Sequence, residues 1–263
     1  MCKNPHEVGE IHMKKSLSLA TIFSGVLMIL VFWQVLSWLL NSPIMPSPIE
    51  VIPIFLTSMT GDLGLHFLAS TGRVLASITL AVITAVPAGL ALGQMPKLNR
   101  IFDPLIAIIY PIPKIVFLPV IYILMGITDI SKIFLIAVIV FFQILVVVRD
   151  EAANLLPELI LSVRSIGAGR RALFRYVYIP ASLPAVLTAL RISIGTAVAV
   201  LFIAEQSLTT YGLGYYIIVE TYQVLLYAEM YAGILGMSLL GLTLYFLIDY
   251  LERTFNKHLY LEK

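Results

Sequence analysis

The chain has little of what a soluble enzyme, a disulfide-stabilised domain or a nucleic-acid-binding protein requires. Only 12% of its 263 residues are charged, about half the proportion typical of a soluble domain. It contains one cysteine, Cys2, so no disulfide can form within the chain. The formal net charge of +2 is too small to indicate nucleic acid as a partner. The medium around most of the chain is therefore expected to be lipid.

The residue patterns of nucleotide binding, metal binding and catalysis are also missing. No phosphate-binding loop of the form G-x-x-x-x-G-K-S/T occurs anywhere in the sequence. The histidines His6, His12, His66 and His258 are scattered, without the spacing of a metal site. We therefore expect no catalytic residues, no metal and no cofactor held by this chain.

Long apolar runs are what the sequence does have. Its hydrophobic content is 60% and its mean hydropathy is +0.97. A helix that crosses a bilayer needs about 20 apolar residues, and runs of about that length lie at 17–40, 74–95, 101–125, 132–148, 183–204 and 229–249. They predict an all-α, polytopic membrane protein with about six transmembrane helices in a single domain, 1–263. The third run should be a broken helix, because it contains Pro104, Pro111, Pro113 and Pro119.

The distribution of Lys and Arg predicts the orientation in the membrane. Short loops rich in these residues stay in the cytoplasm, and this rule places both termini there, with outer loops at about 41–73, 126–131 and 205–228. The apolar stretch 51–59 is too short to cross and should form a short interfacial helix. Four basic residues fall in outer segments or inside spans: Arg73, Lys114, Lys132 and Arg191.

The longest polar segment, 149–182, has the local signals of two short helices. Pro157 suits a first helical position, Glu158 complements the positive end of the helix dipole, and Gly167 suits the left-handed residue just past the end. A second helix is predicted over 170–178, where it should be stopped by Pro180. Periodicity alone leaves two interpretations open: a compact projection into the cytoplasm, or a segment on the membrane surface whose arginines meet lipid headgroups.

A resemblance favours the first interpretation. Gly167, followed after nine residues by VYIP at 177–180, resembles the signature of the cytoplasmic loop in permease subunits of ABC importers. Further segments resemble motifs of the same family in the same order: MPSP at 45–48, STGRVL at 70–75, DPLIAIIYPIPKIVFLP at 103–119, SKIFL at 131–135 and GLGY at 212–215. The resemblance covers about residues 45–253 and is to the branch that serves sulfonates, taurine, nitrate and thiamine-precursor pyrimidines.

The resemblance implies a type I importer permease fold and a function. The chain would move a small solute inward, for example an organic anion such as a sulfonate. Its implied partners are an ABC ATPase subunit that binds the ATP, an extracytoplasmic substrate-binding protein and a second permease subunit, expected to be an identical copy. Residues of the loop that would meet the ATPase are Glu158, Leu161, Ser162, Val163, Gly167, Gly169, Arg170, Arg171, Phe174, Arg175 and Pro180. The alternative is an autonomous, ion-coupled secondary transporter, but half-molecule repeats and midplane carboxylates are not visible.

The loop departs from the family pattern at one place. Its usual Glu-Ala-Ala falls on Leu161, Ser162 and Val163, so the carboxylate that would meet the ATPase is missing there. The Glu-Ala-Ala at 151–153 lies about ten residues too early and is interpreted as a coincidence. We hypothesise that Glu158, one turn before Leu161, replaces it.

Few polar residues inside the spans could line a path for solute. Lys114 lies in the broken third span between Pro113 and Pro119, where its ammonium could meet an anion. Pro111, Pro113, Gln143 and Glu205 are further candidates. The alternative for Lys114 is a structural role, in which it snorkels or pairs with a carboxylate such as Glu205. Gly89 and Gly93 form a small-xxx-small pair that predicts close helix packing. The identity of the solute stays open.

Overall fold

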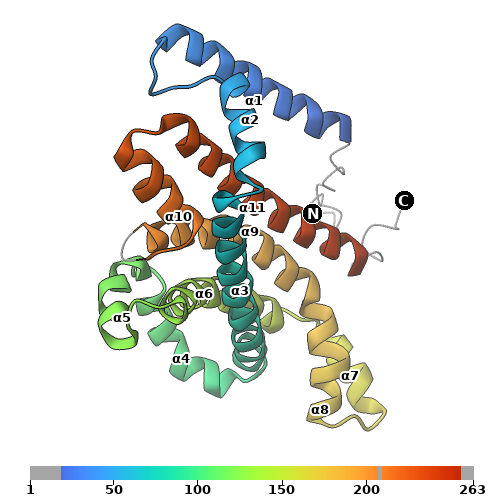
Figure 1. Ribbon diagram of the computed structural model, residues 1–263. Coiled ribbons are helices and arrows are strands. Elements are labelled where there is room, and N and C mark those ends of the chain that lie inside the picture. Colours follow the sequence, from blue (N-terminus) through green and yellow to red (C-terminus); the bar gives the residue numbers. More distant parts are fainter. Residues whose placement is uncertain (1–18, 207–208, 256–263) are drawn as a thin grey trace, which may run out of the picture. The chain divides into compact units, whose positions relative to one another are not determined.

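A computed structural model describes residues 19–206 and 209–255, and every regular element within them is helical (Figure 1). The expectations about Cys2, His6, His12, His258 and the two termini fall outside these residues. The chain divides into two units, residues 1–50 and 51–263, and each is described by itself.

The first unit contains one membrane-length helix, α1 (Leu19–Leu40), whose apolar side chains are largely exposed. The segment after it folds back along the helix, because Trp33 Nε1 donates to Pro46 O over 3.0 Å and Ser37 Oγ donates to Met45 O over 2.8 Å. The predicted short helix is confirmed as α2 (Pro48–Ser58), which starts in this unit and has 11 residues.

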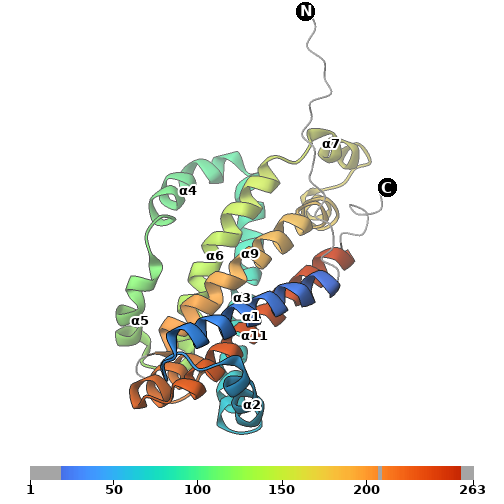
Figure 2. The same ribbon diagram turned by 90° about the horizontal axis from the view of Figure 1, so that it is seen from above.

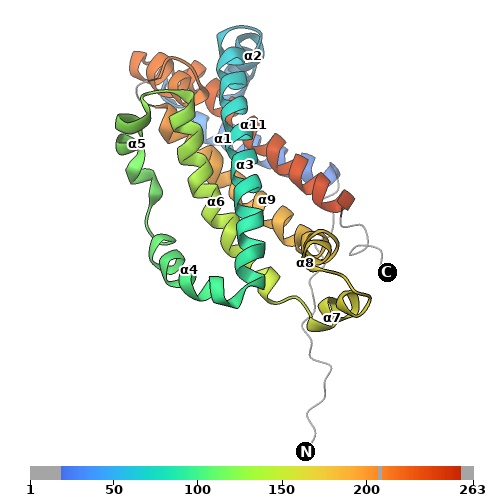
Figure 3. The same ribbon diagram turned by 90° about the horizontal axis from the view of Figure 1, so that it is seen from below.

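The core of the second unit is built from four long helices (Figures 2 and 3): α3 (Asp62–Gln94), α6 (Asp129–Ala153), α9 (Ile179–Glu205) and α11 (Tyr227–Phe255). Helix α6 packs against both α3 and α9, and α9 packs against α11. Small residues make the first contact close. A Cβ at Gly93 would lie 2.5 Å from Arg149 O, and one at Gly89 would lie 2.9 Å from the Cβ of Val148. The predicted close packing is therefore confirmed.

The third span is broken, as predicted. It consists of α4 (Pro96–Ile109), the 3₁₀ turn η1 (Lys114–Phe117) and α5 (Leu118–Met125), with a bend of 81° between its two halves. Pro111 and Pro113 lie in the bend, where each lacks the N–H that a continuous helix would use. Within the described residues, five helices are long and apolar enough to cross a membrane, or six if this bent pair counts as one span.

Two sequence-based boundaries are wrong. Helix α3 begins at Asp62, twelve residues before the predicted span, because its first turns bury the polar stripe His66, Ser70 and Arg73 rather than an apolar one. The predicted stop at Pro180 also does not occur. Here α7 (Pro157–Ser165) is followed by α8 (Arg170–Leu173) and the π turn η2 (Phe174–Tyr178), which continues directly into α9.

The wide π turn explains why the chain stays helical through Pro180. Ile179 N–H bonds to Phe174 O, five residues back, so the turn is already open where the proline ring follows. Between α7 and α8 the prediction is confirmed, since Gly167 has φ +85°, which favours glycine. Helices α7 and α8 lie at one end of the α6 and α9 pair, whereas α5 and the segment 213–224 lie at the other end (Figure 3). We call the end with α5 and the segment 213–224 the distal end.

Candidate functional site

The first candidate surface is the pair of short helices at 157–178. Ser162 and Ser165 each donate a hydrogen bond to a carbonyl oxygen three or four residues back within α7. Leu161 is 62% exposed and Ile166 is 82% exposed. Apolar groups with this exposure, close to charged ones, are typical of a surface that a partner covers. The side chains of Pro157, Leu159 and Arg170 fall outside the described part of the structure.

The opposite side of this pair is anchored on the bundle. Leu173 is 2% exposed, Val177 is 8% exposed and Phe174 is half-buried, so the apolar side of the second helix packs inward. The charged residues Glu158, Arg171 and Arg175 are exposed and, among the described residues, none of them forms an ion pair. The pair is therefore fixed on one side and free to make charge-assisted contacts on the other.

The second candidate site is a cavity of about 350 Å³ beside the bend of the third span, which we call the central cavity. It brings together four of the residues expected to line a path: Pro111, Pro113, Lys114 and Gln143. Its remaining walls come from the same bend and from helices α6 and α9: Tyr110, Ile112, Ile115, Ile139, Phe142, Thr196 and Val200. Residues from three spans that are far apart in sequence thus surround one cavity.

Lys114 holds the bend together as well as lining this cavity. Its ammonium donates to the carbonyl oxygens of Ile109, Tyr110 and Ile112, at 3.1, 3.0 and 3.3 Å. These carbonyls lie where the broken helix leaves backbone acceptors free. The ammonium also lies 4.6 Å from the centre of the Phe142 ring, within reach of a cation–π interaction. The positive charge is therefore placed at the cavity wall without a carboxylate beside it among the described residues.

Gln143 offers a polar group to the same cavity. Its Nε2 donates to Thr196 Oγ1 over 3.2 Å, whereas its buried Oε1 has no hydrogen-bond partner among the described residues. A buried polar atom without a partner is uncommon in proteins and indicates that something else satisfies it. The central cavity thus presents a cation from one wall and an amide from another.

Glu205 lies apart from the central cavity, in a buried network at the distal end. It is 0% exposed and bonds to Arg73 Nη1 at 2.6 Å, to the Ser70 hydroxyl at 2.8 and 2.9 Å and to Gly214 N–H at 3.0 Å. Arg73 in turn holds Asp129 through Nη2 at 2.7 Å. Lys114 is not paired with Glu205, so that structural alternative for the lysine does not apply.

The same network explains the GLGY sequence. Gly212 has φ +134°, and a Cβ there would overlap the Glu205 carboxyl group, so only glycine fits. His66 Nδ1 lies 3.0 Å from the nitrogen and 3.1 Å from the oxygen of Gly212, and His66 Nε2 lies 3.1 Å from a carboxylate oxygen of Glu220. Burial raises the pKa of the neighbouring Tyr216 phenol above its ordinary value. Sequence reasoning missed this network, although the spacing of the polar residues in 66–73 was a signal for it.

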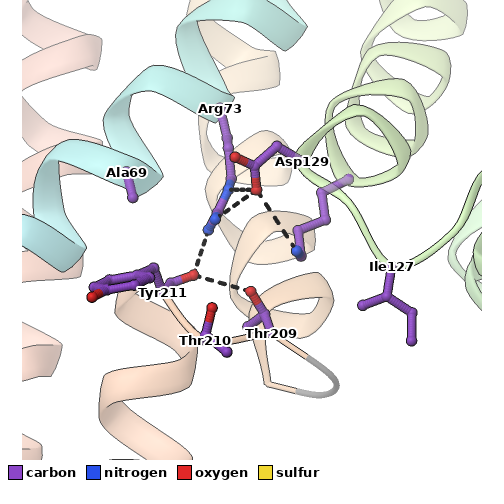
Figure 4. A pocket seen from close by; sticks show the side chains of 8 residues that line it. Ala69, Arg73, Ile127, Asp129, Thr209, Thr210 and Tyr211 are labelled. Atoms are coloured by element: carbon purple, nitrogen blue, oxygen red, sulfur yellow. Dashed lines mark hydrogen bonds and ion pairs between the residues drawn. The ribbon is translucent and has the colours of Figure 1, made fainter.

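A second cavity, of about 390 Å³, adjoins this network and is shown in Figure 4. We call it the distal cavity. It is lined by Ala69, Arg73, Ile127, Asp129, Lys132, Thr209, Thr210 and Tyr211. Arg73 Nη1 donates to Tyr211 O over 2.7 Å, which ties α3 to this segment of the chain. Most of the lining is polar or charged, in contrast to the apolar exterior of the long helices.

Membrane-length helices, a broken span with a cavity beside it, and two short helices exposed at one end define a membrane permease. Comparison with known proteins identifies the kind. Residues 77–257 match the family described as "Binding-protein-dependent transport system inner membrane component". The taurine transport system permease protein TauC of Escherichia coli (strain K12) is 33% identical over 204 residues, 74% of either chain. A putative ABC transporter permease protein of Methanocaldococcus jannaschii is 30% identical and covers 84% of this chain and 85% of its own.

A solved structure has the same fold. A chain from a crystal structure of the MetNI methionine ABC transporter in an inward-facing conformation superposes on this chain with a TM-score of 0.61. The two are 20% identical, and the match covers 75% of this chain and 97% of that chain. The chain belongs to the binding-protein-dependent transport system inner membrane component family. It is the multi-pass inner-membrane permease subunit of an ATP-driven importer and not an enzyme. The family implies an ATPase subunit and a substrate-binding protein as partners.

Proposed function

We propose that this permease moves a small organic anion inward through the central cavity, as one of two identical subunits. The observation that carries the proposal is the position of Lys114, a cation at the wall of a cavity of about 350 Å³ beside the broken span. A charge at this depth costs roughly 2.5–3.5 kcal/mol on insertion scales, so it is retained only where it serves the fold or the solute. The similar protein TauC is named as a taurine permease, and taurine carries a sulfonate.

We further propose that α7 and α8 receive the ATPase on the cytoplasmic side, within the loop 149–182. Support comes from the exposed apolar residues Leu161 and Ile166 and from the exposed charges beside them. This assignment puts both termini in the cytoplasm, in agreement with the distribution of basic residues. It also makes the distal end the side on which the binding protein delivers solute.

Helix continuity supports a mechanical role for this surface. The apolar helical stretch runs unbroken from Arg171 to Glu205, a length of 35 residues, or about 50 Å at 1.5 Å per residue. A displacement of α8 by the ATPase would therefore move α9 as a rigid element. The cavity walls contributed by α9, Thr196 and Val200, would move with it and change access to the central cavity.

The coupling surface is tested by Glu158→Ala, with Glu151→Ala as the matched control. Both glutamates are exposed, and they lie seven residues apart in the same loop. In proteoliposomes with the ATPase and binding protein, Glu158→Ala should lower the solute moved per ATP hydrolysed about tenfold, whereas Glu151→Ala should change nothing. Loss of coupling in Glu151→Ala alone would show that the Glu-Ala-Ala at 151–153 is the working motif and that our alignment of the loop is wrong.

The central cavity is tested by Lys114→Met and Lys114→Arg, with labelled taurine as the probe. Arginine keeps the charge and the donors to the carbonyl groups, whereas methionine keeps only the length of the side chain. We expect about a tenfold fall in the maximal uptake rate for Lys114→Met and at least partial activity for Lys114→Arg. If methionine lowered the thermal stability but left uptake per folded protein unchanged, Lys114 would serve the bend only.

A further inference from the structure

We propose that the distal cavity is a second binding site, specific for a small oxyanion, and that the Lys132 ammonium is its principal contact. This goes beyond the central cavity and the coupling surface, neither of which uses Lys132. The site lies at the start of α6, at the opposite end of that helix from the segment that leads to α7. Small oxyanions here include sulfonate, carboxylate and sulfate groups.

Lys132 is a buried cation whose donors are barely used. Its side chain is 2% exposed, and its only polar partner among the described residues is Asp129, whose Oδ1 lies 3.9 Å from Nζ. That separation exceeds a hydrogen bond. An ammonium has three donors, and buried donors are satisfied in nearly all native proteins. The free donors of Lys132 are therefore available to a ligand in the cavity that this residue lines.

Of the charged groups around the cavity, Lys132 has the weakest partner. Arg73 bonds to Asp129 Oδ1 through Nε at 2.9 Å and through Nη2 at 2.7 Å. Glu205 is likewise bonded by Arg73 and is 0% exposed. Arg73 and Lys132 carry two positive charges and Asp129 and Glu205 carry two negative ones, so the cluster is neutral overall. Arg73 bonds to both carboxylates, whereas the nearest carboxylate oxygen to Lys132 Nζ is 3.9 Å away. An oxyanion in the cavity would therefore gain a charge-assisted hydrogen bond from Lys132.

The remaining lining suits the oxygen atoms of such a group. The Thr210 hydroxyl lines the same cavity and can donate to an anion. Thr209 Oγ1 is 3.2 Å from Tyr211 O, so its hydroxyl is already engaged in ordering this segment. A volume of about 390 Å³ accommodates a small molecule rather than a segment of a partner protein. The burial of Lys132 also favours a free solute over a carboxylate from the binding protein.

The two cavities lie along one face of α6. Lys132, Ile139 and Gln143 are spaced i, i+7 and i+11, which places them on one stripe of the helix. The distance along the axis from Lys132 to Gln143 is about 16 Å at 1.5 Å per residue. Ile136, on the same stripe between them, is 0% exposed. An order of binding, first at Lys132 and then at Lys114, rests on the proposed function; binding at Lys132 does not.

The test measures anion binding to the purified importer, with permease and ATPase subunits together in nanodiscs. Sodium methanesulfonate is titrated against sodium chloride at equal ionic strength, and the thermal unfolding midpoint of the permease is followed. We expect a saturable increase in the wild type. Loss of one charged hydrogen-bond donor typically weakens binding roughly 10- to 100-fold, so the apparent Kd should rise by that factor in Lys132→Met. It should stay within about threefold in Lys132→Arg.

Two further variants distinguish binding in the distal cavity from binding elsewhere in the permease. Lys114→Met removes the cation of the central cavity, and it should leave the response that depends on Lys132 intact. Thr210→Val alters the distal lining without touching a buried charge, and we expect it to raise the Kd roughly three- to tenfold. It serves as the reporter if Lys132→Met does not fold.

Three results would overturn the proposal. They are the absence of a saturable methanesulfonate response in the wild type, an unchanged Kd in both Lys132→Met and Thr210→Val, and loss of the response in Lys114→Met instead. Weaker capture of the binding protein by Lys132→Met, without an effect on methanesulfonate, would assign the lysine to a partner carboxylate. None of these results would affect the coupling test at Glu158, so the two proposals fail separately.

Discussion

The buried Arg73–Glu205 pair predicts that its two members are unequal in energy. Removing the charge of Glu205 leaves Arg73 still bonded to Asp129 at 2.7 Å and to Tyr211 O at 2.7 Å. Removing Arg73 instead leaves the fully buried Glu205 with hydrogen bonds from Ser70 and Gly214 but no counter-charge on the atoms that it contacts. Arg73→Gln should therefore destabilise the protein more than Glu205→Gln.

The expected magnitudes follow from these contacts. An uncompensated buried charge costs about 3–5 kcal/mol, which is the range we expect for Arg73→Gln. Glu205→Gln weakens charge-assisted hydrogen bonds but leaves no buried charge alone, so about 1–3 kcal/mol is expected. In the double variant the carboxylate that suffers from the loss of Arg73 is gone. The loss in free energy of unfolding of the double variant should therefore be smaller than the sum of the two single losses by at least about 1 kcal/mol.

The assay is equilibrium unfolding of the purified chain in mixed micelles with increasing SDS, for the wild type, the two single variants and the double variant. The free energies of unfolding of the four proteins close the cycle. Additive losses, or a larger loss for Glu205→Gln than for Arg73→Gln, would refute the reasoning. In the first case the pair would not interact, and in the second Asp129 would not compensate Arg73.

Two other substitutions test the packing of the bundle. Gly93→Ala should cost about 1–3 kcal/mol, because its Cβ would lie 2.5 Å from Arg149 O; Gly72→Ala in the same helix, with nothing within 4 Å, should be neutral or stabilising by up to about 1 kcal/mol. Thermal unfolding in detergent compares the two, and equal losses would argue against close α3–α6 packing. Arg191→Met should cost about 3–5 kcal/mol by the same assay, because it leaves Glu252, now 2.8 Å from the guanidinium, buried without its partner; a loss below about 1 kcal/mol would contradict this.

Features that depend on neighbouring residues could be predicted from the sequence. The number of spans follows from hydropathy, the break in the third span from its prolines, and the end of α7 from Gly167. The grouping of Lys114 with Gln143 was anticipated only as two separate candidates, and the cavity that joins them required the packing of α6 against the bend. Local sequence features thus predict the helices and their breaks, whereas the central cavity depends on tertiary contacts between them.

Features that depend on distant residues were missed for a physical reason. Arg73 and Glu205 are 132 residues apart, and nothing in either segment alone identifies the other as its partner. Hydropathy also placed the start of α3 too late, because the buried polar residues of its first turns lower the mean hydropathy there to a value typical of a loop. Pro180 was expected to end a helix, but the π turn before it removes the conflict with the preceding carbonyl groups.

The charged clusters show how α9 is held within the second unit. At the middle of α9, Arg191 contacts Asp249 and Glu252 of α11 at 3.1 and 2.8 Å. At its C-terminal end, Glu205 contacts Arg73 of α3 at 2.6 Å. The two positions are 14 residues apart, or about 21 Å along the helix. Because ion pairs on two sides fix α9 at two levels, a displacement entering through α8 cannot be absorbed by bending α9 alone. It must be shared with α3 and α11. The stretch of α9 between the two clusters carries Thr196 and Val200, which line the central cavity, so a movement of α9 reaches that cavity.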